Sequence, residues 1–322
     1  MANQVNKKEK IFSIINNNKL LVVLIVLIIA GYFISDRFLT YNNIMSMLSQ
    51  LSLVGIVACG VTFNFISRNV DVSVGAVVSL TCVIAILLQP YGWIFATIIA
   101  LLAGIATGSL NGFIIGKLKG NSLIITLAMM VIVSSFEMQL TGEGRILYGD
   151  RLSPFSFFGK QKILGIPFPI ILWIIIILIS YFLLTKIRIG KYIFSIGTDE
   201  NVAWLYGIRV SNVKILIFII SGFLAAISGV ILASKLSGAM AYIGDYILYE
   251  AFIAVILGGT SLSGGRGSIG NTLVGVLIVG VILNLALLLG LDYYLQDVIR
   301  GIILIIVLLF DKNRVKEDWS FK

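Results

Sequence analysis

The sequence contains no histidine, and only 12% of its 322 residues are charged. Without histidine the chain has no imidazole metal ligand and no Ser-His-Asp or Cys-His catalytic arrangement. With so few charges and 59% hydrophobic residues, a water-soluble fold could not cover its apolar surface. The composition therefore indicates a membrane protein, and it argues against the many enzymes that need a histidine base.

Cysteine is scarce as well, with Cys59 and Cys82 both in apolar stretches. Two thiols cannot complete a zinc site, so we expect small apolar core residues here and no metal in this chain. The net charge of +9 is compatible with nucleic-acid binding. In a membrane protein, however, excess Lys and Arg mark cytoplasmic loops, and no nucleic-acid partner is expected.

What the sequence does contain is a series of apolar segments separated by short polar clusters. Most segments have about the twenty residues that a helix needs to cross the hydrocarbon. Ten are predicted, over residues 19–35, 44–66, 72–88, 93–116, 122–140, 167–185, 214–234, 246–257, 268–290 and 294–310. The first could be a signal peptide, but GYFISDRF is a poor cleavage site, and we expect a retained helix. The predicted fold class is an all-α polytopic membrane protein with a single domain over residues 1–322.

The basic residues set the orientation of these segments. If the N-terminus is cytoplasmic, the inner segments hold seventeen Lys and Arg and the outer segments hold six, with Arg300 inside the last span. This asymmetry predicts cytoplasmic tails at 1–18 and 311–322. The stretches 44–140 and 214–310 have similar length and would insert in opposite orientations. They suggest an inverted repeat, as in many transporters, although the two stretches share little sequence.

Two connections are unusually long. Residues 141–166, on the outer side, predict a small external feature. Residues 186–213, on the inner side, contain TDENVAWLYGI, which predicts a short amphipathic helix. Asp199 and Glu200 are favourable near its N-terminus, and Gly207 is suited to ending it.

Residues 257–270 read LGGTSLSGGRGSIG and match two nucleotide-binding glycine patterns. A P-loop needs Lys and then Ser or Thr after its last glycine, whereas Gly264 is followed by Gly265 and Arg266. A dinucleotide turn needs a βαβ unit, which apolar helices cannot supply. The glycines therefore predict tight turns and close packing. The glycines at 104, 108, 112 and 116 recur every fourth residue, a pattern typical of close helix contacts.

Polar residues interrupt the apolar segments at a few positions. In FISRNVDVSVGAVV, Asp71 and Ser73 stand where a helix begins, so N-capping and the lining of a solute path are both open, and Arg68 could pair with Asp71. Buried charge in a bilayer is costly, which makes the carboxylates functional candidates. Glu137 and Glu250 lie near the predicted outer ends, so snorkelling or hydration is the alternative. The full set of candidate path residues is Asn64, Asp71, Ser73, Thr126, Glu137 and Glu250.

VILGGTSLSGGRGSIGNTLVG resembles a segment of the membrane-spanning permease of bacterial ATP-binding-cassette importers for ribose, galactose, xylose and related solutes, a family that includes autoinducer-2 importers. The resemblance covers about residues 42–311, and VDVSVGA looks like the family's I-D-L-S-V-G-A. The glycine-rich family loop comprises Gly258, Gly259, Thr260, Ser261, Gly264, Gly265, Arg266 and Gly267. The chain departs from the family at Arg68-Asn69, usually two glycines, at Ser122-Leu123, usually Pro-Phe, and at Leu248, commonly acidic.

The resemblance implies that loop 186–213 carries a coupling helix that docks on an ATPase. The matching residues are Asp199, Glu200, Asn201, Ala203 and Gly207, and they fit the family's E-A-A…G pattern only in part. The resemblance also implies separate cytoplasmic ATP-binding subunits, which would bind ATP and Mg²⁺, so that this chain needs no cofactor. It implies an external solute-binding protein, a second permease copy or paralogue, and a multi-pass location in the bacterial cytoplasmic membrane.

The function predicted from this resemblance is that of a non-enzymatic permease subunit that imports a monosaccharide. A neutral sugar needs no compensating charge along its path, which agrees with the few intramembrane charges. Autoinducer-2 and nucleosides are the alternative substrates. An ion-driven secondary transporter is the alternative of a different class, and it would need better-placed carboxylates than Glu137 and Glu250.

Overall fold

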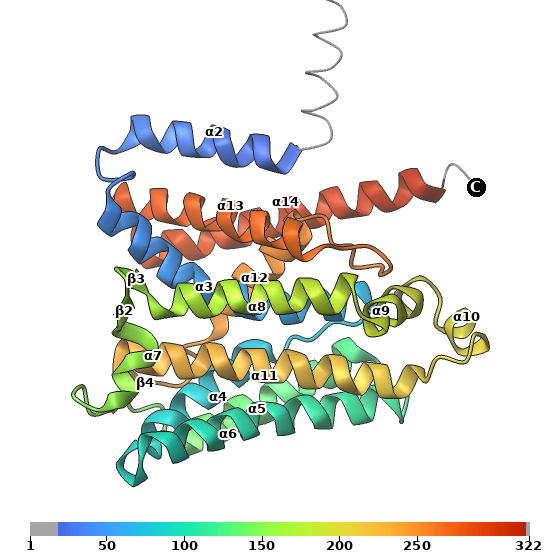
Figure 1. Ribbon diagram of the computed structural model, residues 1–322, viewed down its shortest axis with the longest axis horizontal. Helices are drawn as coiled ribbons and strands as arrows, with labels where there is room; N and C mark the ends of the chain where they lie inside the picture. Colours follow the sequence, from blue (N-terminus) through green and yellow to red (C-terminus); the bar gives the residue numbers. More distant parts are fainter. Residues whose placement is uncertain (1–18, 320–322) are drawn as a thin grey trace, which may run out of the picture.

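The computed structural model describes residues 19–319, with side chains described as far as residue 309. Within this range, each of the ten predicted apolar segments contains one helix (Figure 1). These are α2 (Lys19–Ile34), α3 (Tyr41–Ile66), α4 (Val74–Leu87), α5 (Trp93–Gly116), α6 (Ser122–Leu140), α8 (Phe168–Thr185), α11 (Val210–Leu236), α12 (Asp245–Leu257), α13 (Ile269–Leu288) and α14 (Tyr293–Trp319). The predicted all-α class is confirmed.

Six of these helices are long and apolar enough to cross a membrane: α3, α5, α6, α8, α11 and α13. Helices α2 and α4 are apolar but shorter. The chain is therefore a polytopic membrane protein, while ten membrane crossings remain a prediction. Of the predicted tails, 1–18 lies outside the described residues, and α14 continues as a helix beyond residue 310 to Trp319.

The shorter elements gather at the two ends of the bundle (Figure 1). At one end lie β1 (Leu147–Tyr148), α7 (Phe157–Lys160), β2 (Lys162–Ile163), β3 (Ile166–Pro167) and β4 (Gly238–Ala239), with the turns η1 (Gln89–Tyr91) and η2 (Pro154–Ser156). Strand β1 pairs antiparallel with β4, and β2 pairs antiparallel with β3. Residues 141–166 thus form a small feature of short elements at this end, and its location on the outer side remains a prediction. At the opposite end lie α9 (Arg188–Thr198) and α10 (Glu200–Leu205).

The ends of the described chain point the same way. The first turn of α2 and the last turn of α14 both lie toward the end of the bundle that holds α9 and α10 (Figure 1). This arrangement agrees with a topology in which both tails and the loop 186–213 share one side. The identity of that side as cytoplasmic remains a prediction from charge.

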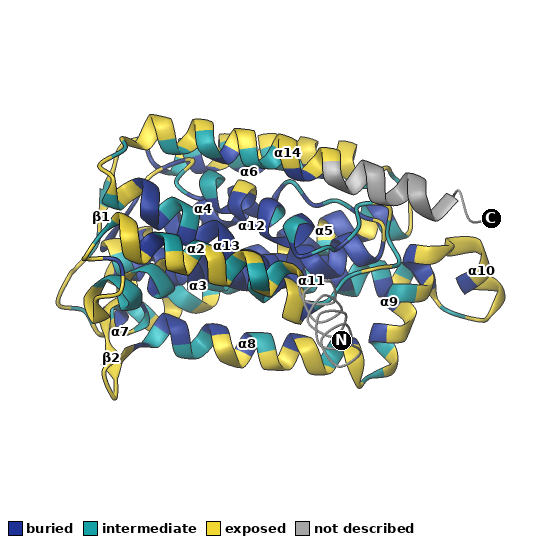
Figure 2. Cartoon of the chain, turned by 90° about the horizontal axis from the view of Figure 1, so that it is seen from above, coloured by how far each residue is buried: buried dark blue, intermediate teal, exposed yellow. Residues whose placement is uncertain are grey.

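The core is built around α3 and α11. Every residue of α3 from 51 to 66 is buried, and α11 packs against α3, α4 and α5. Figure 2 shows the buried residues gathered in the middle of the bundle and exposed residues along α8 and α14. Many of the exposed side chains are large and apolar, as expected for helices that face lipid. Cys59 and Cys82 are buried and unbonded, which confirms the core interpretation.

Helices α5 and α11 meet along the predicted glycine repeat. A Cβ on Gly104 would lie 2.5 Å from the carbonyl oxygen of Gly222, and one on Gly108 would collide with the carbonyl oxygen of Phe218. The same applies to Gly112 against Ile215 on the next turn. The four-residue glycine spacing therefore brings two helix backbones into contact, as the sequence predicted.

Candidate functional site

The short helix α10 is closed at both ends by its own sequence. Asp199 is the N-cap, and its Oδ1 accepts hydrogen bonds from the backbone N–H of Asn201 at 2.8 Å and of Val202 at 3.1 Å. At the other end Gly207 has φ +80°, the left-handed conformation that glycine adopts freely. Its N–H bonds to Trp204 O, and the N–H of Ile208 bonds to Ala203 O. This pair of bonds is a Schellman motif, which fixes a helix of six residues.

One face of α10 is held by the bundle. Ala203 is 1% exposed, and Glu200 forms a 2.6 Å salt bridge with Lys214 at the start of α11. The five residues predicted for coupling, Asp199, Glu200, Asn201, Ala203 and Gly207, therefore all lie in α10 or at its caps. Most of them have a structural reason for their identity, and their role in coupling remains a prediction.

Most of the remaining surface in the second half of α10 and at its C-cap is apolar and exposed. Trp204 is 68% exposed, Leu205 is 73% exposed and Tyr206 is 84% exposed, with Val202 beside them. A cavity of about 280 Å³ between α9 and α10 is lined by Ser195, Asp199 and Tyr206, among others. Sequence reasoning treated WLY as part of an amphipathic helix and did not single it out. Three adjacent large residues in an otherwise polar loop were the available signal.

The glycine-rich loop between α12 and α13 lies against the ends of α3 and α9. Gly265 N–H donates to Ile66 O at 2.9 Å, and a Cβ on Gly264 would lie 2.6 Å from Gly197 O. Gly264 has φ +83° and Gly265 has φ +73°. Since helices flank the loop on both sides, the packing interpretation is confirmed against the nucleotide patterns. We call this contact of Ile66, Gly197, Gly264 and Gly265 the backbone junction.

A buried polar segment separates α3 from α4. Residues 67–73 leave the helical conformation, and two of their N–H groups bond to side chains of α6: Val70 N–H to Ser122 Oγ at 3.1 Å and Val72 N–H to Thr126 Oγ1 at 3.2 Å. Non-helical backbone inside a membrane protein needs such partners because lipid offers none.

Asp71 is bound within this segment by hydroxyl groups. Its Oδ1 accepts from Ser73 Oγ at 2.6 Å and from Ser73 N at 3.1 Å, and its Oδ2 accepts from Ser221 Oγ of α11 at 3.1 Å. Asn111 Nδ2 of α5 donates to Ser73 Oγ at 2.9 Å. The expected pair between Arg68 and Asp71 is wrong, since the hydroxyl donors take its place. Ser73 occupies the N-cap position of α4, but its side chain makes no capping bond.

Asn64 and Glu137 are fully buried, and their side-chain polar atoms have no hydrogen-bond partner among the described residues. Around Glu137, the hydroxyls of Ser79 and Ser134 lie nearby but outside hydrogen-bond geometry. Glu137 does not snorkel, because it points into the protein. Two buried polar side chains without a partner at membrane depth are unusual, and their place in a solute path remains a prediction.

Glu250 has a partner that the sequence did not reveal. Arg300 Nε of α14 donates to Glu250 Oε1 at 2.8 Å, and Arg300 Nη1 donates to Asp297 Oδ1 at 2.5 Å. Glu250 is 1% exposed and Arg300 is 5% exposed. Snorkelling is therefore wrong for Glu250 as well. The available signal was one base and one acid within two predicted spans, 246–257 and 294–310, that are separated in sequence by a third.

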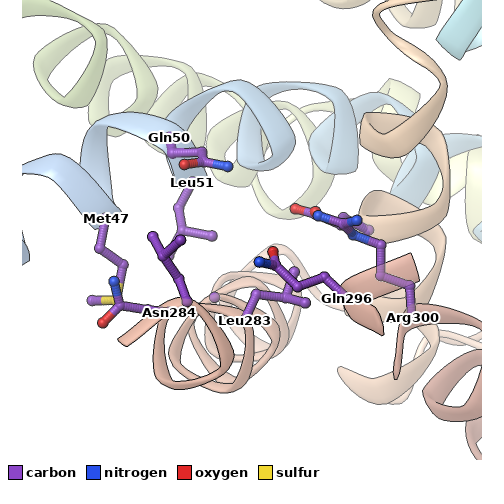
Figure 3. A pocket seen from close by; sticks show the side chains of 10 residues that line it. Met47, Gln50, Leu51, Leu283, Asn284, Gln296 and Arg300 are labelled. Carbon is purple, nitrogen blue, oxygen red and sulfur yellow. The ribbon is translucent and has the colours of Figure 1, made fainter. Parts of the chain in front are cut away.

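The six predicted path residues fall into separate places. Asp71 and Ser73 lie within the segment 67–73, and Thr126 bonds to it from α6. Glu250, by contrast, borders a cavity of about 50 Å³ between α3, α13 and α14. Figure 3 shows this cavity with Gln50, Asn284, Gln296 and Arg300 around it. Amides and a buried ion pair make it polar at a depth where most neighbours are apolar.

Comparison with known proteins places this geometry in context. Residues 43–308 match the family described as the permease component of branched-chain amino acid transport systems. The chain is 34% identical over 285 residues to the ribose import permease protein RbsC of Escherichia coli K12, covering 87% of this chain and 89% of the relative. It is 36% identical over 279 residues to RbsC of Bacillus subtilis 168, covering 86% and 87%. It is 37% identical over 294 residues to the L-arabinose transport system permease protein AraH of E. coli K12, covering 87% and 85%. No solved structure matches.

Proposed function

Because the chain belongs to this family of transport-system permease components, we propose that it is the membrane-spanning subunit of an ATP-binding-cassette importer for a monosaccharide such as ribose or arabinose. The observation that carries the proposal is the identity of 34–37% to ribose and arabinose permeases over most of both chains. The family description mentions branched-chain amino acids, but these relatives are named for sugars. Nucleosides and autoinducer-2 remain the competing solutes.

The exposed apolar face of α10 is the surface proposed to dock on the ATPase. Trp204 and Tyr206 belong to the residue types that contribute most to interface affinity, and Leu205 adds exposed apolar surface between them. The caps at Asp199 and Gly207 keep the helix short and rigid. ATP and Mg²⁺ bind in the partner subunit on this account, and the location is the bacterial cytoplasmic membrane.

The backbone junction offers a route from α10 to the membrane helices. Helix α9 ends next to α10, and its Gly197 contacts both Ile66 and the glycine-rich loop without an intervening side chain. A displacement of α10 would therefore reach α3, α12 and α13 through backbone contact. The segment 67–73, which follows Ile66 directly, is where α3 gives way to α4. We propose that closure of the ATPase rocks these helices and changes which end of the path is open.

Two further partners complete the proposed importer. An external solute-binding protein would deliver the sugar to the end of the bundle that carries β1–β4, opposite α10. A second copy of this chain, or a close relative, would supply the other half of the path. Selectivity by the binding protein would let the membrane path remain neutral and loosely polar.

A substrate panel tests this proposal. The chain is reconstituted with its ATPase and binding protein, and uptake of radiolabelled ribose, arabinose, a nucleoside and leucine is compared. The proposal expects ATP-dependent uptake of one or both sugars and none of leucine. Uptake of leucine or a nucleoside in place of both sugars would contradict the substrate, and uptake without the ATPase would favour a secondary transporter.

A further inference from the structure

A third cavity lies between the start of α12 and the first three turns of α14. It has a volume of about 340 Å³, and its lining includes Asp245, Tyr246, Tyr249, Tyr293, Asp297 and Arg300. We call it the tyrosine pocket. Its volume falls in the range of about 300–1,000 Å³ that small-molecule sites occupy. Apart from the ion pair, nothing described above accounts for this gathering of aromatic and acidic side chains.

The lining suits a solute with one apolar face and many hydroxyl groups. Tyr249 and Tyr293 are about half exposed, and Arg300 stands over the Tyr293 ring at 5.6 Å from its centroid, so the Tyr249 ring and the exposed part of the Tyr293 ring are available to the C–H face of a sugar ring. Asp245 and Asp297 carry only acceptor oxygens when ionised, and a sugar hydroxyl can donate to each. Aromatic surface combined with a few placed polar groups is typical of small-molecule sites.

The charge arrangement disfavours carboxylate-bearing solutes. Among the described residues that line the pocket, Arg300 is the only basic one; it is 5% exposed and is already bonded to Glu250 and Asp297. An amino-acid carboxylate would therefore meet Asp245 and Asp297 without a free cation to bind. Like charges placed together at a binding surface are unfavourable. The tyrosine pocket is thus better matched to a neutral solute than to the amino acids of the family description.

The position of the pocket fits delivery from outside. Helix α12 follows β4, which pairs with β1 at the end of the bundle opposite α10. Under the predicted orientation, a solute released by the binding protein reaches this end first. Arg300 borders both the tyrosine pocket and the smaller amide-lined cavity of Figure 3, so the two spaces adjoin at this side chain.

We propose that the tyrosine pocket is an outer subsite where a neutral, hydroxyl-rich solute pauses before entering the path. This inference rests on the proposed importer function and assigns it specific residues. Tyr249 and Tyr293 provide the stacking surface, and Asp245 and Asp297 accept the hydroxyls. The ion pair of Glu250 with Arg300 holds α14 against α12 and forms the inner wall.

The first test measures how fast the reconstituted importer takes up the sugar that the unmodified protein transports. The double variant Tyr249→Ala/Tyr293→Ala should lower uptake about tenfold while stimulation of the ATPase by the binding protein persists. Tyr293→Phe keeps the ring and should retain most of the uptake, and Tyr91→Ala, an exposed tyrosine outside the pocket, is the matched control. Uptake by the double variant equal to that of Tyr91→Ala would overturn the subsite.

A labelling experiment gives a readout independent of transport. Tyr293→Cys is treated with a membrane-impermeant maleimide, which is informative because Cys59 and Cys82 are buried. Saturating ribose or arabinose should slow labelling at position 293, and leucine should not, while Tyr91→Cys is labelled at the same rate throughout. Labelling unaffected by either sugar would contradict the subsite even if the importer transports sugar. Protection by sugar would support it even if reconstituted uptake failed.

Discussion

Arg300 Nε of α14 lies 2.8 Å from Glu250 Oε1 of α12, and both side chains are almost fully buried. Removing Glu250 leaves the buried Arg300 with only the half-exposed Asp297 as a partner, and breaking a buried ion pair typically destabilises a protein by up to about 3–5 kcal/mol. Glu250→Ala should therefore lower the melting temperature of the purified protein in detergent. The double variant Glu250→Ala/Arg300→Met should recover much of the loss, because it removes the stranded charge. If the double variant were as unstable as Glu250→Ala, the stranded Arg300 charge would not be the cause of the loss.

Gly108→Ala tests the contact between α5 and α11. The added Cβ would collide with the carbonyl oxygen of Phe218, and overpacking of this kind commonly destabilises by about 1–3 kcal/mol. Gly301→Ala is the matched control, since a Cβ there meets nothing within 4 Å and removes a helix-interior glycine. Thermal unfolding of both variants should show a loss for position 108 and no loss for position 301. Equal melting temperatures would contradict the glycine contact.

Trp204→Ala, Leu205→Ala and Tyr206→Ala test the exposed face of α10. Because buried aromatic anchors dominate interface energies, loss of Trp204 should weaken co-purification with the ATPase by about tenfold or more. Leu164→Ala, at a still more exposed apolar residue at the other end of the bundle, should leave assembly unchanged. Melting temperatures should match the unmodified protein throughout. Undiminished assembly of the triple variant would place the ATPase contact elsewhere.

Gly207 and Gly264 require glycine for different reasons: backbone conformation at Gly207 and lack of space for a side chain at Gly264. At Gly207 nothing lies within 4 Å of an added Cβ, so a substitution acts only through the left-handed φ of this residue. Asn adopts this conformation more readily than Val, so Gly207→Asn should retain more transport than Gly207→Val. At Gly264 an added Cβ would lie 2.6 Å from Gly197 O, so even Gly264→Ala should lower both stability and transport. The measurement is transport per ATP hydrolysed together with the melting temperature. A stable Gly264→Ala variant with full coupling would remove the backbone junction from the proposed route.

The sequence predicts the helices better than their connections. Apolar runs of about twenty residues have few alternatives in lipid, which explains why α3, α5 and α13 begin and end close to the predicted limits. Helix α9 was not separately predicted, because RIGKYIFSIGT is too short and too polar for a span. The pairing of Leu147 with Ala239 joins two-residue strands far apart in sequence, and no local pattern marks it.

Candidate site residues follow the same division. Asp199 and Gly207 were predictable because a helix cap is local, and their geometry depends on residues within three positions. The partners of Asp71 and Glu250 were not, because Ser221 lies 150 positions from Asp71 and Arg300 lies 50 positions from Glu250. Their position in apolar stretches marks these carboxylates as unusual in the sequence. Which groups bind them depends on how the helices pack, and this is visible only in the structure.

ATP-driven sugar uptake is the most direct test of the central claim that this chain is a passive path energised by a separate subunit. Proteoliposomes that contain the chain, its ATPase and its binding protein should accumulate radiolabelled ribose or arabinose only when ATP is present. Vesicles that contain the chain alone should neither hydrolyse ATP nor accumulate sugar. Accumulation by the chain alone, driven by an ion gradient, would contradict the account.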